Sequence, residues 1–242
     1  MTRIFLPGLD TGAGDVTVTG KDSVHIASSL RMRPGESIII CDGKGNDAVC
    51  VIKSAKADQT VCQIVDVRPS PAEPPVKTFI YQSLPKGDKF EFIIQKTTEL
   101  GVTGIIPVLS DRCISRPDGR AFEKKLIRYR DICREAAQQC GRGVIPDVFP
   151  LTDFKSAVTS VPDGAAGVFC YEKEKNTSLR SVLSAVRCGE LHVFIGPEGG
   201  FSDAESGLAV SAGLTPVTFG DRILRCETAP VYVMSAVSYE FS

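Results

Sequence analysis

The chain has 242 residues, 43% hydrophobic and 24% charged, which is the balance of an ordinary soluble globular protein with room for one large domain or two small ones. A net charge of −1 argues against a protein that coats nucleic acid nonspecifically. No segment has the apolar length of a transmembrane helix or a signal peptide, so we expect a cytoplasmic protein without a membrane partner.

Cysteine and histidine usage argues against a metal site. The nine cysteines contain no Cys-x-x-Cys pair, their count is odd, and the chain has only two histidines. We therefore expect reduced, mostly buried thiols and no bound metal. His25 is expected to be a structural residue of the first domain, and His192 a core residue.

The first 68 residues contain short β-branched segments separated by turns. The strand candidates are Ser37–Cys41, Ala48–Ile52 and Val61–Val67. Several short strands with little helix predict a small β-barrel over residues 1–70. Four prolines within residues 69–75 then favour an extended linker.

From residue 76 onward, apolar strand candidates alternate with helical patterns. The strand candidates are Val76–Leu84, Thr103–Leu109, Ala165–Cys170, Leu191–Ile195 and Pro216–Phe219. The helix candidates are Gly87–Leu100, Ala121–Cys140, Ser178–Val186, Ser202–Ala212 and Pro230–Phe241. This alternation predicts an α/β domain over residues 76–242, with a mostly parallel sheet and helices on both faces.

Basic residues are concentrated in one part of the chain. Residues 111–142 contain nine Lys or Arg against five Asp or Glu, whereas residues 143–242 contain seven against twelve. A basic stretch in a neutral chain is suited to phosphate contact. On charge alone, a solvated helix face explains it equally well.

A glycine-rich segment follows the predicted strand Leu191–Ile195. It reads Ile195-Gly-Pro-Glu-Gly-Gly-Phe-Ser-Asp-Ala-Glu205, and its Ser-x-x-Glu predicts a capping box that begins a helix. Ligands bind beyond the carboxyl ends of parallel strands, where glycines let the backbone approach them closely. The spacing differs from dinucleotide and phosphate loops. On spacing alone, a tight capped turn without a ligand is the slightly better interpretation.

A second segment, Phe219–Pro230, repeats this arrangement. It reads Phe-Gly-Asp-Arg-Ile-Leu-Arg-Cys-Glu-Thr-Ala-Pro, so a strand end and a glycine precede a loop and a helix begun by Thr228 and Pro230. Its charged side chains indicate either a surface salt-bridge cluster or a ligand site. Two such loops in one parallel sheet favour a shared pocket.

Together, these two segments resemble the signature of the ribosomal RNA small subunit methyltransferase E family, which is part of the SPOUT superfamily of knotted methyltransferases. Three further motifs resemble the same family: Lys96-Thr-Thr-Glu-Leu-Gly101, Glu135-Ala-Ala-Gln-Gln-Cys-Gly-Arg142, and His25 followed by Leu30-Arg31-Met32 and Asp42-Gly43. The resemblance covers nearly the whole chain.

The family resemblance implies a fold, a cofactor and a substrate. It implies a PUA-like RNA-binding barrel over residues 1–70 and a SPOUT domain with a deep trefoil knot over residues 76–242. It also implies a homodimer formed through the knotted domain, with S-adenosyl-L-methionine bound at or near the interface. The implied reaction is methylation of N3 of a specific uridine in 16S rRNA, and the implied partner is that RNA or the small ribosomal subunit.

Cofactor contacts are expected from the two loops and from the end of the strand Ala165–Cys170. The candidates are Phe169, Cys170, Tyr171, Ile195, Gly196, Pro197, Gly199, Gly200, Phe219, Gly220, Ile223, Leu224, Arg225, Glu227, Thr228 and Ala229.

Two charged residues are candidates for catalysis. Uracil N3 is a poor nucleophile while protonated, so the site must remove its proton or stabilise the uracil anion. Arg225 is a candidate for stabilising charge on the uracil oxygens, and the alternative is an ion pair with Glu227 or Glu198. Glu198 is a candidate base, and it could equally orient a backbone amide or bind a ribose hydroxyl.

Phosphate contacts are expected from arginines. The candidates are Arg3, Arg31, Arg33, Arg112, Arg116 and Arg142. For any one of them a solvated surface position is the simpler interpretation, but as a group we expect a few to touch RNA.

Two other functions fit the same motifs. A knotted RNA ribose 2′-O-methyltransferase would place the methyl group on the sugar. A non-catalytic RNA-binding module for ribosome assembly would keep the fold without the reaction, and it predicts a broken cofactor loop. Both loops are intact in this sequence.

Overall fold

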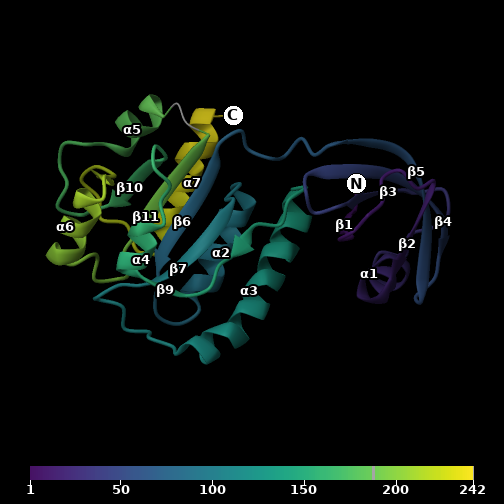
Figure 1. Cartoon of the computed structure of the whole chain (residues 1–242). Coiled ribbons are helices and arrows are strands. Elements are labelled where there is room, and N and C mark those ends of the chain that lie inside the picture. Colours follow the sequence, from purple (N-terminus) through teal and green to yellow (C-terminus); the bar gives the residue numbers. More distant parts are fainter. Residues whose placement is uncertain (187–188, 242) are drawn as a thin grey trace. The chain divides into compact units, whose positions relative to one another are not determined.

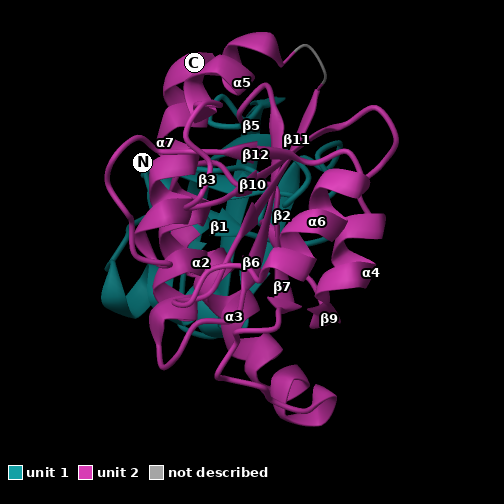
Figure 2. Cartoon of the chain, turned by 90° about the vertical axis from the view of Figure 1, so that its left-hand side faces the viewer, with its two compact units in different colours: residues 1–73, 137–145 teal, residues 74–136, 146–242 magenta. Residues whose placement is uncertain are grey.

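Two compact units make up the chain in the computed structural model, which describes residues 1–186 and 189–241. The first unit contains residues 1–73 and 137–145, and the second contains residues 74–136 and 146–242 (Figure 2). Cys188, one of the nine cysteines, lies outside the described residues. The return of residues 137–145 to the first unit has no signal in the sequence pattern.

The first unit is built on a five-stranded sheet. Its strands are β1 (Arg3–Phe5), β2 (Asp15–Thr19), β3 (Ser37–Cys41), β4 (Asn46–Ala55) and β5 (Gln59–Pro69), in the order β1-β3-β4-β5-β2 (Figure 1). β1 pairs with β3 in parallel, and the other pairs are antiparallel. The three predicted strands are confirmed, whereas the short β1 and β2 were missed.

A short helical segment in the first unit was also missed. It comprises α1 (Gly20–Val24) and a π-helical turn, η1 (His25–Ser29). The segment is held by tertiary contacts, because Ile26 is fully buried and the Ser23 hydroxyl is hydrogen-bonded to the Lys56 carbonyl. Such contacts override the weak helix propensity of its serine and valine residues. The His25 side chain is exposed.

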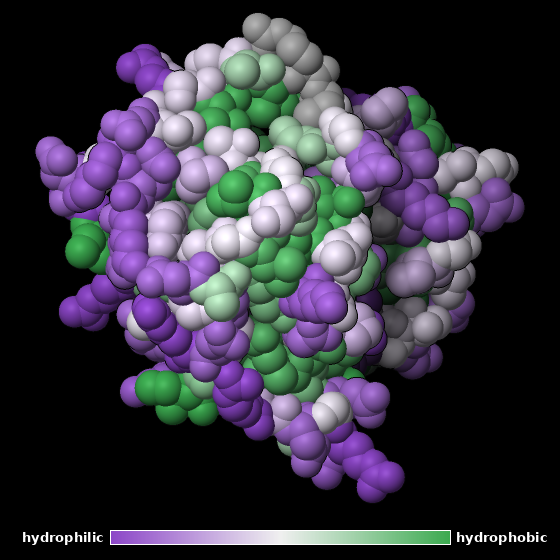
Figure 3. Space-filling view, turned by 60° about the vertical axis from the view of Figure 1, so that its left-hand side comes forward, coloured by the Kyte–Doolittle hydropathy of each residue, from purple (hydrophilic) through white to green (hydrophobic). Residues whose placement is uncertain are grey.

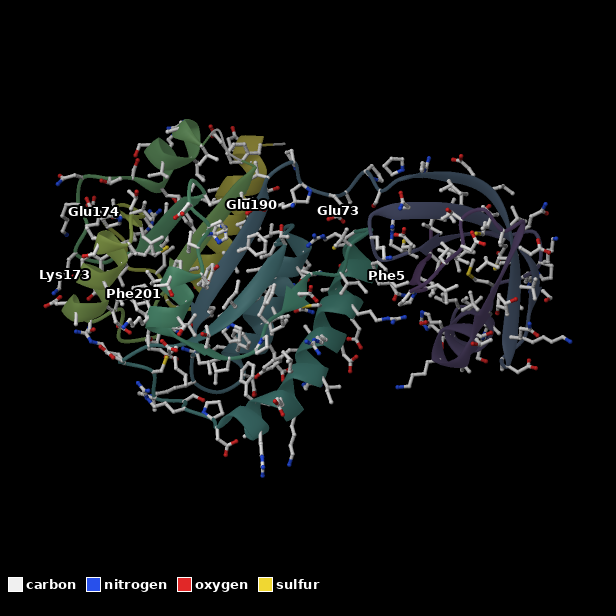
Figure 4. The ribbon with its side chains drawn as sticks, viewed as in Figure 1. Phe5, Glu73, Lys173, Glu174, Glu190 and Phe201 are labelled. Atoms are coloured by element: carbon white, nitrogen blue, oxygen red, sulfur yellow. The ribbon has the colours of Figure 1, made fainter. Side chains whose placement is uncertain are left out.

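One buried and one partly buried ion pair link segments of the first unit that are far apart in the sequence. Arg3 donates to both carboxylate oxygens of Asp47, at 2.6 and 2.8 Å, and Arg142 donates to Glu73 at 2.8 Å. Glu73, which Figure 4 labels, also accepts the backbone N–H groups of Gly143 and Val144. Arg3 and Arg142 are only 8% and 3% exposed. The prediction that these two arginines contact RNA phosphates stays untested, and their guanidinium groups are buried against carboxylates.

The second unit is built on a parallel sheet, as predicted. Its strands are β6 (Lys77–Ser83), β7 (Gly104–Leu109), β8 (Asp147–Val148), β9 (Thr152–Asp153), β10 (Ala166–Cys170), β11 (Glu190–Ile195) and β12 (Thr215–Val217). The order is β12-β10-β11-β6-β7-β8, and β9 also pairs with β7. Every pair is parallel. The five predicted strands are confirmed, and the two-residue β8 and β9 were missed.

Helices cover both faces of this sheet. They are α2 (Lys89–Glu99), α3 (Gly119–Cys140), α4 (Phe154–Thr159), α5 (Leu179–Ala185), α6 (Asp203–Ser211) and α7 (Thr228–Phe241). Figure 2 shows α2 and α7 on one face and α4 and α6 on the other, which confirms the predicted layers. Only α4 was missed. Within the described ranges, no helix is both long and apolar enough to span a bilayer.

Aromatic side chains form much of the core beside β11. The rings of Tyr81 and Phe194 stack with centroids 4.1 Å apart, and His192 stacks on Phe79 at 5.0 Å. His192 is 4% exposed, which confirms its predicted place in the core, and burial lowers its pKa.

Replacing Arg3 with Met is expected to destabilise the first unit by about 3 kcal/mol, because it leaves the Asp47 carboxylate buried without its cation. Chemical denaturation measures this loss. Lys53→Met is the matched control, since Lys53 pairs with Asp15 on the surface and its loss should cost less than about 1 kcal/mol. Equal losses in the two variants would contradict the account.

Candidate active site

The carboxyl ends of β10, β11 and β12 surround a cavity of about 460 Å³. This volume is typical of a small-molecule site. The first glycine loop follows β11 and the second follows β12. Because β10 lies between these two strands, the loops are on either side of the end of β10. The end of β10, at Cys170 and Tyr171, also lines the cavity.

The first loop requires glycine at two positions for different reasons. A Cβ atom on Gly196 would lie 3.1 Å from the backbone of Gly200, which cannot move away without opening the loop. Gly200 itself has a φ of +65°, a left-handed conformation that other residues rarely adopt. The predicted capping box is confirmed, because the Ser202 and Glu205 side chains each accept the other's backbone N–H. The loop therefore contains a close contact between two backbone segments in addition to the capped turn.

The loop between β7 and α3 holds the first glycine loop in place. Arg112 donates to the carbonyl of Gly199 at 2.7 Å, and Asp111 accepts from the Ser202 hydroxyl at 2.6 Å. Arg116 donates to the carbonyls of Ser110 and Asp111. Both arginines are exposed, yet both guanidinium groups already bind backbone carbonyls. Their predicted phosphate contact is untested, and their observed contacts fix loops.

The second loop is more open. The Ile223 side chain is 84% exposed at the cavity, and Gly220 has a φ of +90°. The carbonyl of Arg225 accepts the N–H groups of Thr228 and Ala229, and this turn begins α7 where it was predicted. An exposed isoleucine beside a cavity leaves apolar surface available to a ligand.

A lysine that the sequence analysis did not select joins the two loops. Lys89, the first residue of α2, has its Nζ 3.1 Å from Glu198 Oε1 and 3.2 Å from Glu227 Oε2. Glu198 belongs to the first loop and Glu227 to the second. Lys89 lies more than a hundred residues before both glutamates, so the sequence indicated only that it is near the start of a predicted helix.

This ion-pair cluster keeps both glutamates ionised. Burial raises the pKa of Glu198, but the Lys86 backbone N–H and the Lys89 ammonium outweigh it, and the net pKa is lowered. The pKa of Glu227 is likewise lowered despite burial, by hydrogen bonds that include those from Cys226 and Lys89. A carboxylate with a lowered pKa is a weak proton acceptor. The geometry thus disfavours Glu198 as a base and favours the alternative, since Glu198 orients the Lys86 amide.

Arg225 lacks the ion pair that was its alternative explanation. Glu198 and Glu227 both bind Lys89, and among the described residues no carboxylate lies within ion-pair distance of the Arg225 guanidinium. Arg225 is exposed and lines the cavity. Its charge is therefore available to a bound group.

Most predicted contacts line the cavity, but four do not. Phe169 is buried in the core, and Gly199, Glu227 and Thr228 are not among the lining residues. Sequence reasoning missed seven lining residues: Lys89, Glu172, Glu174, Lys175, Phe201, Val217 and Thr218. Three of these, Glu172, Glu174 and Lys175, belong to the loop after β10 (Figure 4 labels Glu174), which extends beyond the predicted strand end and carries no motif.

The two cysteines that line the cavity are poor nucleophiles. Burial raises the pKa of the Cys226 thiol to about 12, and burial raises that of Cys170 further. Thiols with such values stay protonated near neutral pH. In the described part of the chain, no three His, Cys, Asp or Glu side chains are grouped as metal ligands. The arrangement can bind a small molecule through backbone groups and present two exposed arginines, Arg222 and Arg225, to it.

Comparison with known proteins gives consistent matches. A family model for an RNA methyltransferase domain matches residues 72–238, and one for an RNA methyltransferase PUA domain matches residues 18–65. The ribosomal RNA small subunit methyltransferase E of Bacillus subtilis is 36% identical over 230 residues, covering 93% of this chain and 90% of the relative. The protein of that name from Mycobacterium bovis is 33% identical over 231 residues, covering 94% and 87%.

Solved structures agree with these matches. The crystal structure of a ribosomal RNA small subunit methyltransferase E from Neisseria gonorrhoeae, bound to S-adenosyl methionine, aligns with a TM-score of 0.87 at 33% identity. The alignment covers 99% of this chain and 97% of that chain.

The cluster predicts a pH-dependent contribution to stability. Folding lowers the pKa of Glu227 from its ordinary value of 4.5. The ionised carboxylate therefore makes its full contribution to the free energy of unfolding when the pH is above 4.5, and this contribution is lost as the pH falls through the lowered pKa. The difference in unfolding free energy between the wild type and Glu227→Gln should therefore shrink between about pH 7 and about pH 3. Urea denaturation across this range measures it, and a difference that grows on acidification would contradict the cluster.

Proposed function

The chain belongs to the ribosomal RNA small subunit methyltransferase E family, and we propose that it transfers the methyl group of S-adenosylmethionine to N3 of a specific uridine in 16S rRNA. The observation that carries this proposal is the cavity at three parallel strand ends, which is lined by the two glycine loops that resemble the family's signature. A relative with 33% identity binds S-adenosyl methionine.

The residues present fit this cofactor. The missing Cβ of Gly196 leaves room for a tight loop, and the backbone from Ile195 to Gly200 lines a cavity of suitable volume. Backbone groups of the second loop, from Gly220 to Arg225, line its other side. When bound, S-adenosylmethionine supplies an activated methyl group, and the protein supplies placement and electrostatics.

Arg225 is the residue we assign to charge stabilisation. Uracil N3 becomes nucleophilic when its proton leaves, and the resulting negative charge spreads onto the ring oxygens. The free guanidinium of Arg225 at the cavity can donate to such an oxygen. Glu198 is assigned to positioning, since its carboxylate binds Lys86 and Lys89. Because Glu198 and Glu227 are both bound to Lys89, the proposed acceptor of the N3 proton is water.

We propose that residues 1–70 form the RNA-binding domain and residues 76–242 the methyltransferase domain. Arg31 and Arg33 are exposed in the first unit and remain proposed phosphate contacts. Arg31 also has a φ of +54°, a conformation that is uncommon outside glycine. Phosphate contacts fix the register of an RNA, so these arginines would orient the substrate.

We also propose a homodimer formed through a knotted second domain, acting in the cytoplasm where ribosomal subunits are assembled. Apolar side chains support a dimer surface, because Phe92 on α2 and Tyr232 and Tyr239 on α7 are exposed on two helices that pack together. Figure 3 shows hydrophobic surface gathered near the centre of one face and bordered by hydrophilic side chains. Light scattering tests the oligomeric state.

The test of the reaction is mass spectrometry of nucleosides from 16S rRNA or small subunits incubated with the protein and S-adenosylmethionine. We expect 3-methyluridine. A 2′-O-methylated nucleoside would support the ribose methyltransferase, and no methylation by protein that binds RNA would support the assembly module. Either result would reject the proposed reaction.

Arg225→Ala should lower kcat by about a hundredfold, because it removes the donor aimed at the developing charge. The Kd for S-adenosylmethionine should change little, since the lining backbone stays intact. Arg222→Ala, the neighbouring exposed arginine of the same loop, is the comparison. A larger loss in kcat for Arg222→Ala than for Arg225→Ala would reassign the role.

A further inference from the structure

We propose that Lys89 is a positioning residue for the cofactor site, whose ammonium group ties the first glycine loop to the second and so sets the separation of the two cavity walls. This inference rests on the proposed function. It assigns a role to a residue of α2, an element outside both signature loops.

The geometry of Lys89 is that of a bridge between two carboxylates. Glu198 Oε1 and Glu227 Oε2 lie at nearly equal distances from its Nζ, 3.1 and 3.2 Å. The three side chains are 34%, 30% and 19% exposed, so they are partly withdrawn from solvent at the cavity. Charge-assisted hydrogen bonds of this length are stronger than neutral ones.

Charge balance explains why one lysine can hold both loops. Without it, two carboxylates from different loops would face each other with no cation between them, and like charges at close range repel. The amino end of α2 adds a partial positive charge that favours both glutamates, and the Lys86 backbone N–H donates to Glu198. Each loop is thus anchored to the start of the same helix.

The second loop has the greater need of such an anchor, because Arg112 already holds the first loop through the Gly199 carbonyl. The second loop contains no residue of a strand or helix from Thr218 to Glu227, and Ile223 and Arg225 in it are exposed. Ordering a loose loop when the cofactor binds weakens affinity. A loop fixed in advance by Lys89 avoids that cost, so Lys89 should affect cofactor affinity more than the chemical step.

Calorimetric titration with S-adenosylmethionine tests the proposal on the full-length wild type, Lys89→Met and Lys89→Arg. We expect Lys89→Met to raise the Kd about tenfold and the KM correspondingly, with kcat within about twofold of the wild type. Lys89→Arg, which keeps a cation able to bind both carboxylates, should restore most of the affinity. Thermal unfolding of each variant establishes that it is folded.

Lys96→Met is the matched control. Lys96 lies on the same helix, is 36% exposed and forms its ion pair among the described residues with Glu99 one turn away, so its loss removes a similar ion pair without touching the loops. It should leave the Kd unchanged. A folded Lys89→Met variant with the wild-type Kd would overturn the proposal, and so would equal weakening by Lys96→Met.

A double-mutant cycle separates positioning from direct contact with the cofactor. If Lys89 acts through Glu227, then Glu227→Gln also raises the Kd, and the double variant binds no worse than Lys89→Met alone. Additive losses would mean that Lys89 binds the cofactor itself and would overturn the bridge. Failure of the wild type to bind S-adenosylmethionine would instead reject the proposed function, which keeps the two failures distinct.

Discussion

Parallel pairing is the constraint on which the site depends. Because β10, β11 and β12 run in the same direction, their carboxyl ends lie at one edge of the sheet, and the loops that follow them must meet there. The position of the cavity thus follows from the direction of the strands, and the shape and charge of its lining come from the loops. Gly196 and Gly200 bring the backbone close on one side, and an open charged loop lines the other.

Competition for ion-pair partners decides what the charged residues can do. Arg225 and Lys89 are both cations near Glu198 and Glu227 in sequence or in space, but only Lys89 binds them. This leaves the Arg225 guanidinium free to face a substrate, and it leaves both glutamates ionised and occupied. In the first unit, Asp47 and Glu73 bind the guanidinium groups of Arg3 and Arg142, so these two cations already have carboxylate partners.

Local sequence patterns predicted most helices and strands, but they do not show which residues pair across the fold. Period and capping signals located α2, α3 and α6, and motif resemblance identified the two loops. The sequence could not reveal that Arg3 pairs with Asp47, because 44 residues separate them and an arginine near a chain end looks like a surface residue. Lys89 was missed for the same reason, and β10 between the glycine loops could be placed only once the strand order was known.

A crystal structure of the protein with S-adenosylmethionine tests the central claim most directly. The account predicts cofactor density in the cavity bounded by Ile195–Gly200 and Gly220–Arg225, with Lys89 still bridging Glu198 and Glu227 behind it. Cofactor bound anywhere else, or bound in this cavity only after the two loops have separated and the bridge has broken, would contradict it.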